Sequence, residues 1–74
     1  MKKKKKIAVL GLGYVGLPLA VSLSSSFKVI GFDISLNRVS QLIKGIDMTL
    51  EVKKEKLLNS QRKNLSLTQN YKDL

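Results

Sequence analysis

Short apolar runs and longer helical patterns alternate along the chain, and this alternation predicts its secondary structure. The runs Ile7–Leu10 and Val29–Phe32 are continuously apolar, and each is followed by a glycine or an acid. Such runs are typical of strands buried on both faces of a parallel sheet. A weaker alternation at Leu65–Thr68 predicts a third strand.

The segments between these runs have the pattern of helices. Residues 14–25 are apolar on all sides until three serines close them, which predicts a helix packed into a core. Pro18 is an irregularity there, because its ring disturbs the carbonyl one turn back. A second, amphipathic helix has its apolar positions on one face, at Leu36, Val39, Leu42 and Ile43.

Capping residues set the limits of the amphipathic helix. Ser35 is placed to cap its N-terminus, and Gly45 is placed to end it. The rest of the chain predicts a loop at 46–50, a short charged helix at 51–59 buried through Leu57 and Leu58, and the opening of a further helix at 71–74.

Composition and charge exclude several classes of function. The chain has 74 residues with no cysteine and no histidine, so it lacks a thiol nucleophile, an imidazole base and the usual zinc ligands. We therefore expect no catalytic residue and no metal site within it. The net charge is +9, but Lys2–Lys6 supply five of the charges in one run. The remaining residues, nine basic and five acidic, describe an ordinary solvated surface.

Neither a nucleic acid nor a membrane is expected as a partner. Nucleic-acid binding usually adds exposed aromatic residues among the basic ones, and the chain has only two tyrosines and two phenylalanines. The lysine run followed by an apolar stretch superficially resembles a secretory signal. However, glycines and Pro18 interrupt the stretch, and no apolar span reaches the roughly 18 residues of a membrane helix. We interpret residues 1–6 as a basic lead-in to the first strand.

The most informative segment is the glycine-rich sequence from Gly11 to Gly16. It follows a predicted strand, opens a predicted helix and precedes an acid, Asp33, by 22 positions from Gly11. This context is the dinucleotide-binding fingerprint. Gly11 permits the tight turn, Gly13 lets the backbone approach a pyrophosphate, and Gly16 lets the helix lie close to the strand. The N–H groups at the start of the helix then face the phosphates.

Asp33 also indicates which cofactor binds. Its carboxylate can accept hydrogen bonds from the ribose hydroxyls and repels a 2′-phosphate, so NAD is favoured over NADP. Arg38 could serve a 2′-phosphate, but beside Asp33 we expect it along the adenine or ribose edge. The structural alternative is that the glycines serve only turns and packing, that Asp33 is a solvated acid and that Arg38 is an exposed helix residue.

Together these features predict the fold class α/β. We expect a Rossmann-like half, β-α-β-α-β, with a three-stranded parallel sheet and right-handed crossovers. A complete dinucleotide fold pairs two such halves. We therefore expect residues 1–74 to be the N-terminal part of an NAD-binding Rossmann domain, truncated from a longer protein.

The residues Ile7–Ala20, with Val29–Ile34 and Arg38, resemble the amino-terminal segment of the nucleotide-sugar 6-dehydrogenases, the UDP-glucose/GDP-mannose dehydrogenase family. The motif Gly-Tyr-Val-Gly-Leu-Pro is the most specific part of this resemblance. Residues 45–52 and 64–68 are similar to the branch that oxidises UDP-N-acetylhexosamines for capsular, Vi-type or O-antigen polysaccharides. The Glu-Pro-Gly-Leu motif usual in UDP-glucose dehydrogenases is missing.

The resemblance implies both the cofactor contacts and the reaction of the parent protein. NAD contacts fall on the loop, at Gly11, Leu12, Gly13, Tyr14, Val15 and Gly16, with Asp33 at the ribose and Arg38 near the adenosine. The family oxidises a sugar C6 alcohol to a carboxylate with two NAD molecules, through a thiohemiacetal or thioester on a downstream cysteine. The catalytic domain and the UDP-sugar domain are absent from this chain. The parent is expected to be cytoplasmic and at least a homodimer.

Two other functions stay open at this point. The first is a fragment of a β-hydroxyacid or hydroxyacyl-CoA dehydrogenase, although those enzymes usually have Met in place of Val15 and lack Pro18. The second is a stand-alone nucleotide-binding module.

Overall fold

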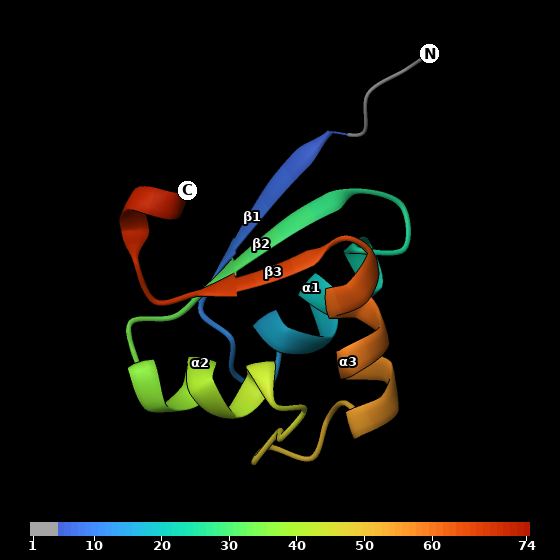
Figure 1. Cartoon of the computed structure of the whole chain (residues 1–74), viewed down its shortest axis with the longest axis vertical. Coiled ribbons are helices and arrows are strands. Elements are labelled where there is room, and N and C mark those ends of the chain that lie inside the picture. The colour runs from blue at the N-terminus through green and yellow to red at the C-terminus, as the bar shows by residue number, and fades with distance from the viewer. Residues whose placement is uncertain (1–4) are drawn as a thin grey trace.

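Three parallel strands form the centre of the computed structural model, which describes residues 5–74 (Figure 1). They are β1 (Lys6–Leu10), β2 (Lys28–Phe32) and β3 (Leu65–Thr68), in the order β1-β2-β3. The register pairs Val9 with Gly31, and Gly31 with Leu67. Of the predicted lead-in, residues 1–4 lie outside the described residues, and Lys6 already belongs to β1.

Helices connect the strands, as the chain pattern predicts. They are α1 (Gly16–Leu23), α2 (Leu36–Ile43) and α3 (Lys54–Lys63), and a short 3₁₀ turn, η1 (Tyr71–Asp73), follows β3. No helix within residues 5–74 combines the length and the apolar character needed to cross a membrane. The α/β class and the three-stranded parallel sheet are confirmed.

The predicted limits of the first and third helices are wrong. α1 begins at Gly16 rather than at residue 14, because the glycine loop first forms a turn. It ends at Leu23, where the hydroxyl of Ser24 donates to the Val21 carbonyl at 2.6 Å and competes with helix bonding. α3 begins at Lys54 rather than at residue 51, and it ends at Lys63 rather than at residue 59. The cause of the later start is the Asp47 carboxylate, which accepts hydrogen bonds from the N–H groups of Glu51 and Val52.

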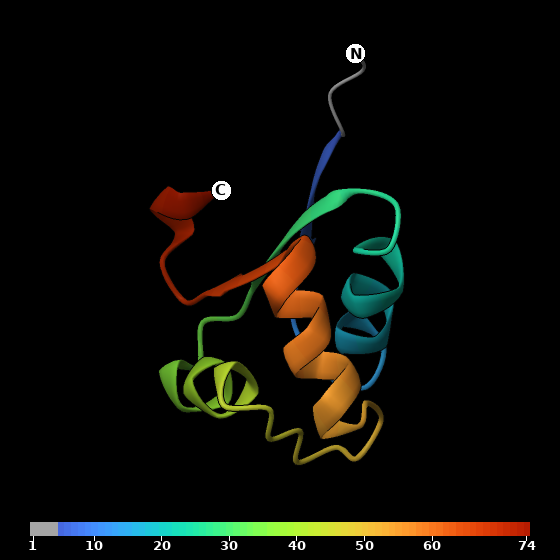
Figure 2. The ribbon, with the colours of Figure 1, turned by 45° about the vertical axis from the view of Figure 1, so that its right-hand side comes forward.

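The helices pack against the sheet and against one another. α1 contacts β1 and β2, whereas α2 and α3 contact β3. Figure 2 shows the sheet nearly edge-on, with α1 and α3 on one side of it and α2 near the carboxyl ends of the strands. The predicted cap of α2 is confirmed, since Ser35 Oγ accepts a hydrogen bond from the Arg38 N–H at 3.1 Å.

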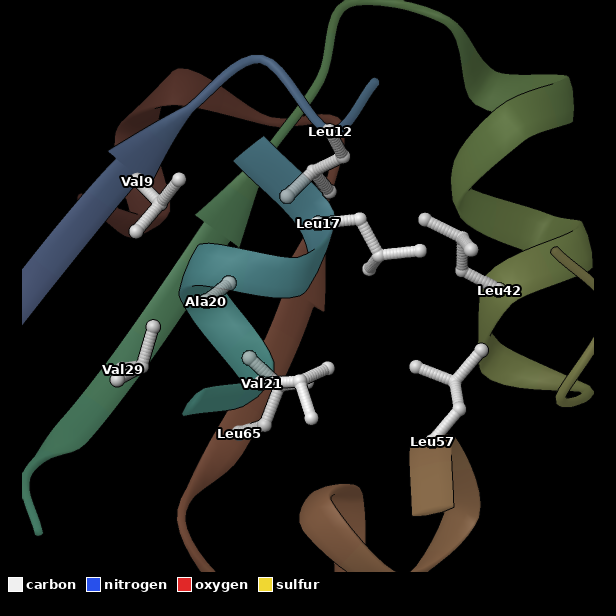
Figure 3. Close-up of a cluster of buried hydrophobic side chains, with 9 residues drawn as sticks. All are labelled: Val9, Leu12, Leu17, Ala20, Val21, Val29, Leu42, Leu57 and Leu65. Atoms are coloured by element: carbon white, nitrogen blue, oxygen red, sulfur yellow. The ribbon is translucent and has the colours of Figure 1, made fainter. Parts of the chain in front are cut away.

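A cluster of aliphatic side chains fills the space between these elements. In Figure 3, Leu17 of α1, Leu42 of α2 and Leu57 of α3 point toward one another. All three are fully buried, as is Leu12 of the glycine loop. Of the predicted face of α2, only Val39 and Leu42 are buried. The other two members of that face, Leu36 and Ile43, are largely exposed. The core therefore joins the loop to all three helices.

The two faces of the sheet are buried to different extents. Val9, Val29 and Leu65 face the helices and are buried. The alternate positions are more open, since Ala8 is exposed and the side chain of Leu10 is 68% exposed. The prediction of strands buried on both faces is therefore wrong for β1.

Candidate functional site

The segment between β1 and α1 turns at the carboxyl end of the sheet. Gly11 begins the turn with φ of +91°, a left-handed conformation that glycine adopts without a Cβ penalty. Its N–H donates to the Phe32 carbonyl of β2 at 2.7 Å. The loop therefore leaves the sheet beside the end of β2, where Asp33 follows.

Gly16 and Gly13 have different surroundings. A Cβ on Gly16 would overlap the carbonyl oxygen of Gly11, so the first turn of α1 lies directly against the start of the loop. A Cβ on Gly13 would meet nothing within 4 Å beyond its chain neighbours. The fold itself thus requires a glycine at position 16, whereas the space at position 13 is open to a ligand.

The loop also carries backbone donors without a protein partner among the described residues. Within residues 5–74, no oxygen accepts a hydrogen bond from the N–H groups of Gly13, Tyr14 or Val15. These groups lie where α1 begins, and the N-terminal N–H groups of a helix have no partner inside the helix. The side chains of Tyr14 and Val15 are 68% and 79% exposed. Phosphate oxygens are acceptors that bind such donors at the start of a helix.

Asp33 is tied to the same loop through its carboxylate. Oδ2 accepts a hydrogen bond from the Leu12 N–H at 3.0 Å, and Oδ1 accepts one from the Ser35 N–H at 2.9 Å. An ionised carboxylate offers about four acceptor positions, so each oxygen keeps capacity for another donor. The side chain is only partly buried. Asp33 is thus placed beside the glycine loop with acceptor sites still available.

Arg38 lies across the loop from the first turn of α2. Its Nε and Nη2 donate to the Leu12 carbonyl at 2.8 and 2.6 Å, and its Nη1 donates to Asp47 Oδ1 at 2.9 Å. The side chain is only 14% exposed. The structure therefore engages the guanidinium with protein groups, and the contact with adenosine stays a prediction.

Asp47 is a residue of this site that the sequence prediction missed. Its carboxylate accepts five hydrogen bonds, from Arg38 Nη1, the Thr49 N–H and hydroxyl, and the N–H groups of Glu51 and Val52. The Asp47 side chain is 1% exposed. One sequence feature could have indicated its local role, namely an aspartate two residues before a threonine. Aspartate side chains often accept hydrogen bonds from backbone N–H groups that follow them in the sequence. That signal does not indicate the long-range partner Arg38.

The surroundings of Asp47 keep its carboxyl ionised. Burial raises the pKa, but the hydrogen bonds from Thr49, Val52 and Arg38 lower it by more, so the pKa falls well below its ordinary value of 3.8. The same loop holds Leu50 at φ of 59°. That left-handed conformation costs a non-glycine residue roughly 1–2 kcal/mol. The bonds to Asp47 therefore hold a loop that includes a strained residue.

We expect the free energy of unfolding to depend on the ionised form of Asp47. The pKa of its carboxyl is lower in the folded chain than in the unfolded chain. Its contribution is therefore complete above the unfolded value of 3.8 and is lost as pH falls below it. The stability difference between wild type and Asp47→Asn should shrink from about pH 6 to about pH 3, as measured by urea denaturation. The two proteins differ at position 47 alone, so a constant difference would contradict this prediction.

Comparison with known proteins agrees with the geometry of the loop. Residues 5–74 match the profile of the UDP-glucose/GDP-mannose dehydrogenase family, NAD binding domain. Over 72 residues the chain is 50% identical to UDP-N-acetyl-D-glucosamine 6-dehydrogenase of Pseudomonas aeruginosa, covering 97% of this chain and 17% of that protein. Over 70 residues it is 49% identical to Protein CapL of Staphylococcus aureus, covering 95% and 16%. The chain spans about one sixth of the length of these curated relatives.

A solved structure of a related dehydrogenase has the same fold over most of this chain. A UDP-D-ManNAc dehydrogenase from Pyrococcus horikoshii superposes with a TM-score of 0.87 at 33% identity, covering 95% of this chain and 18% of that one. The family match also decides between the two kinds of dehydrogenase considered from the sequence, in favour of the nucleotide-sugar enzymes. NAD is the cofactor of this domain family. The chain belongs to the UDP-glucose/GDP-mannose dehydrogenase family and matches its NAD-binding domain.

Proposed function

We propose that the chain supplies the binding site for the AMP half of NAD in a UDP-N-acetylhexosamine 6-dehydrogenase. The observation that carries the NAD site is the set of unengaged N–H groups at Gly13, Tyr14 and Val15, together with the free space beside Gly13. The similarity to UDP-N-acetyl-D-glucosamine 6-dehydrogenase supports the substrate class.

The residues present fit the chemical groups of NAD. The N–H groups of Gly13, Tyr14 and Val15 suit the pyrophosphate, and the free acceptor capacity of Asp33 suits the ribose hydroxyls. Gly11 and Gly16 shape the loop, and Leu12 fixes it to the core. Bound NAD supplies an acceptor for hydride. The residues of this chain bind and orient it.

The proposed reaction of the whole protein is oxidation of the C6 alcohol of the sugar to a carboxylate, with reduction of two NAD. The chain contains no cysteine, so residues outside it would provide the covalent chemistry. We extend the proposal to a cytoplasmic enzyme, at least dimeric, that serves capsular or O-antigen polysaccharide synthesis. The support for this extension is the sequence resemblance.

The first test is the activity of the full-length protein. We expect NAD reduction that depends on a UDP-N-acetylhexosamine, with two NADH formed per sugar oxidised, followed by NADH absorbance. UDP-glucose should be a poorer substrate at equal concentration. Equal or better activity with UDP-glucose would contradict the proposed substrate class. NAD binding without oxidation of any UDP-sugar would favour a nucleotide-binding module instead.

A second test separates ligand approach from folding. Gly13→Val adds a side chain to the space that has no protein neighbour, so NAD affinity should fall below detection by calorimetry while the melting temperature changes little. Gly16→Ala is the matched contrast, because its Cβ overlaps the Gly11 carbonyl and should lower the melting temperature. Unchanged NAD affinity in Gly13→Val would remove the loop from the cofactor site.

A third test concerns the choice between NAD and NADP. Asp33→Asn removes a charged acceptor for the ribose hydroxyls, so NAD should bind about tenfold more weakly. It also removes the charge that repels a 2′-phosphate, so the preference for NAD over NADP should narrow. Glu55→Gln removes the same charge from an exposed position on α3 and serves as the control. If the ratio of the two dissociation constants is the same in Asp33→Asn and wild type, Asp33 does not contact the ribose.

A further inference from the structure

The backbone of Leu12 is bound at both of its polar groups. Its N–H donates to Asp33, and its carbonyl accepts from the Nε and Nη2 of Arg38. A trans peptide is planar, so the carbonyl of one residue and the N–H of the next point in opposite directions. The guanidinium that fixes the Leu12 carbonyl therefore also fixes the direction of the Gly13 N–H, one of the unengaged donors.

Asp47 in turn fixes the guanidinium. The fork of Arg38 is rigid and planar, so the bond from Nη1 to Asp47 orients the Nε and Nη2 edge that holds Leu12. Four hydrogen bonds from its own loop, donated by Thr49, Glu51 and Val52, hold the carboxylate in place. A continuous set of bonds thus runs from the loop after α2 to the Leu12–Gly13 peptide.

Burial excludes a direct contact between Asp47 and a ligand at the glycine loop. The Asp47 side chain is 1% exposed, and its acceptor positions are taken by the groups named above. Any effect of this carboxylate on a bound dinucleotide must therefore pass through Arg38 and Leu12. We propose that Asp47 is a positioning residue for NAD binding, acting through Arg38 on the Leu12–Gly13 peptide. This inference rests on the proposed NAD site.

The test is a double-mutant cycle in the full-length protein, with NAD affinity measured by calorimetry. Asp47→Asn should weaken NAD binding by about 5- to 20-fold. The same change made in an Arg38→Met background should have no further effect on NAD affinity. Methionine has no guanidinium, so Asp47 no longer has a contact through which it could orient the Leu12 carbonyl. An equal loss of affinity in both backgrounds would overturn the proposal.

A matched control separates positioning from loop stability. Thr49→Val removes one hydrogen bond to Asp47 but keeps the Asp47–Arg38 pair. We expect a lower melting temperature with NAD affinity within about twofold of wild type. If Thr49→Val weakens NAD binding as much as Asp47→Asn, the loop and not Arg38 transmits the effect, and the proposal is wrong.

A measurement without ligand keeps the proposal testable if Asp47→Asn does not fold. Arg38→Lys leaves the four loop bonds of Asp47 in place but lacks the planar fork. Hydrogen–deuterium exchange in residues 11–16 should then be faster than in wild type and unchanged in Thr49→Val. Unchanged exchange in Arg38→Lys would overturn the positioning role. The exchange experiment is made without NAD, so its result does not depend on the proposed function. Failure of the wild-type protein to bind NAD would refute the proposed function and not the positioning role.

Discussion

The position of Leu12 is the constraint on which the whole site depends. Its side chain is fully buried in the core, while its N–H and carbonyl are held by Asp33 and Arg38. A shift of the loop would open a gap in the core and break hydrogen bonds to charged groups, which contribute about 1.5–3 kcal/mol each. The loop can turn around this anchor because Gly11 adopts a left-handed conformation and Gly16 lies against the Gly11 carbonyl.

Asp47 shows why a buried charge is compatible with a small core. An unpaired carboxylate would be costly there, but five donors surround it and one belongs to a guanidinium. The same bonds delay the start of α3 and hold Leu50 at a positive φ. The connection between α2 and α3 is therefore an ordered part of the site, although its sequence predicts only a loop.

Local signals predicted much of the fold, and long-range contacts account for most of what they missed. The apolar runs, the Ser35 cap and the glycine spacing act within a few residues, so the strands, α2 and the turn at Gly11 follow from sequence. The start of α3 depends on Asp47, and the role of Arg38 depends on partners 9 and 26 positions away. No periodicity in one sequence encodes such pairings. The partial exposure of β1 likewise depends on which elements cover the sheet.

The position of β1 at the side of the sheet has a consequence for how this half-sheet can be extended. Within residues 5–74, β1 pairs with β2 alone, so its other edge presents backbone groups that can pair with a further strand. In a complete dinucleotide fold, with the strand order 3-2-1-4-5-6, the second half of the sheet adds beside strand 1. The open edge of β1 is thus the place at which a second half would continue the sheet, and the glycine loop that follows β1 would then lie where the two halves meet.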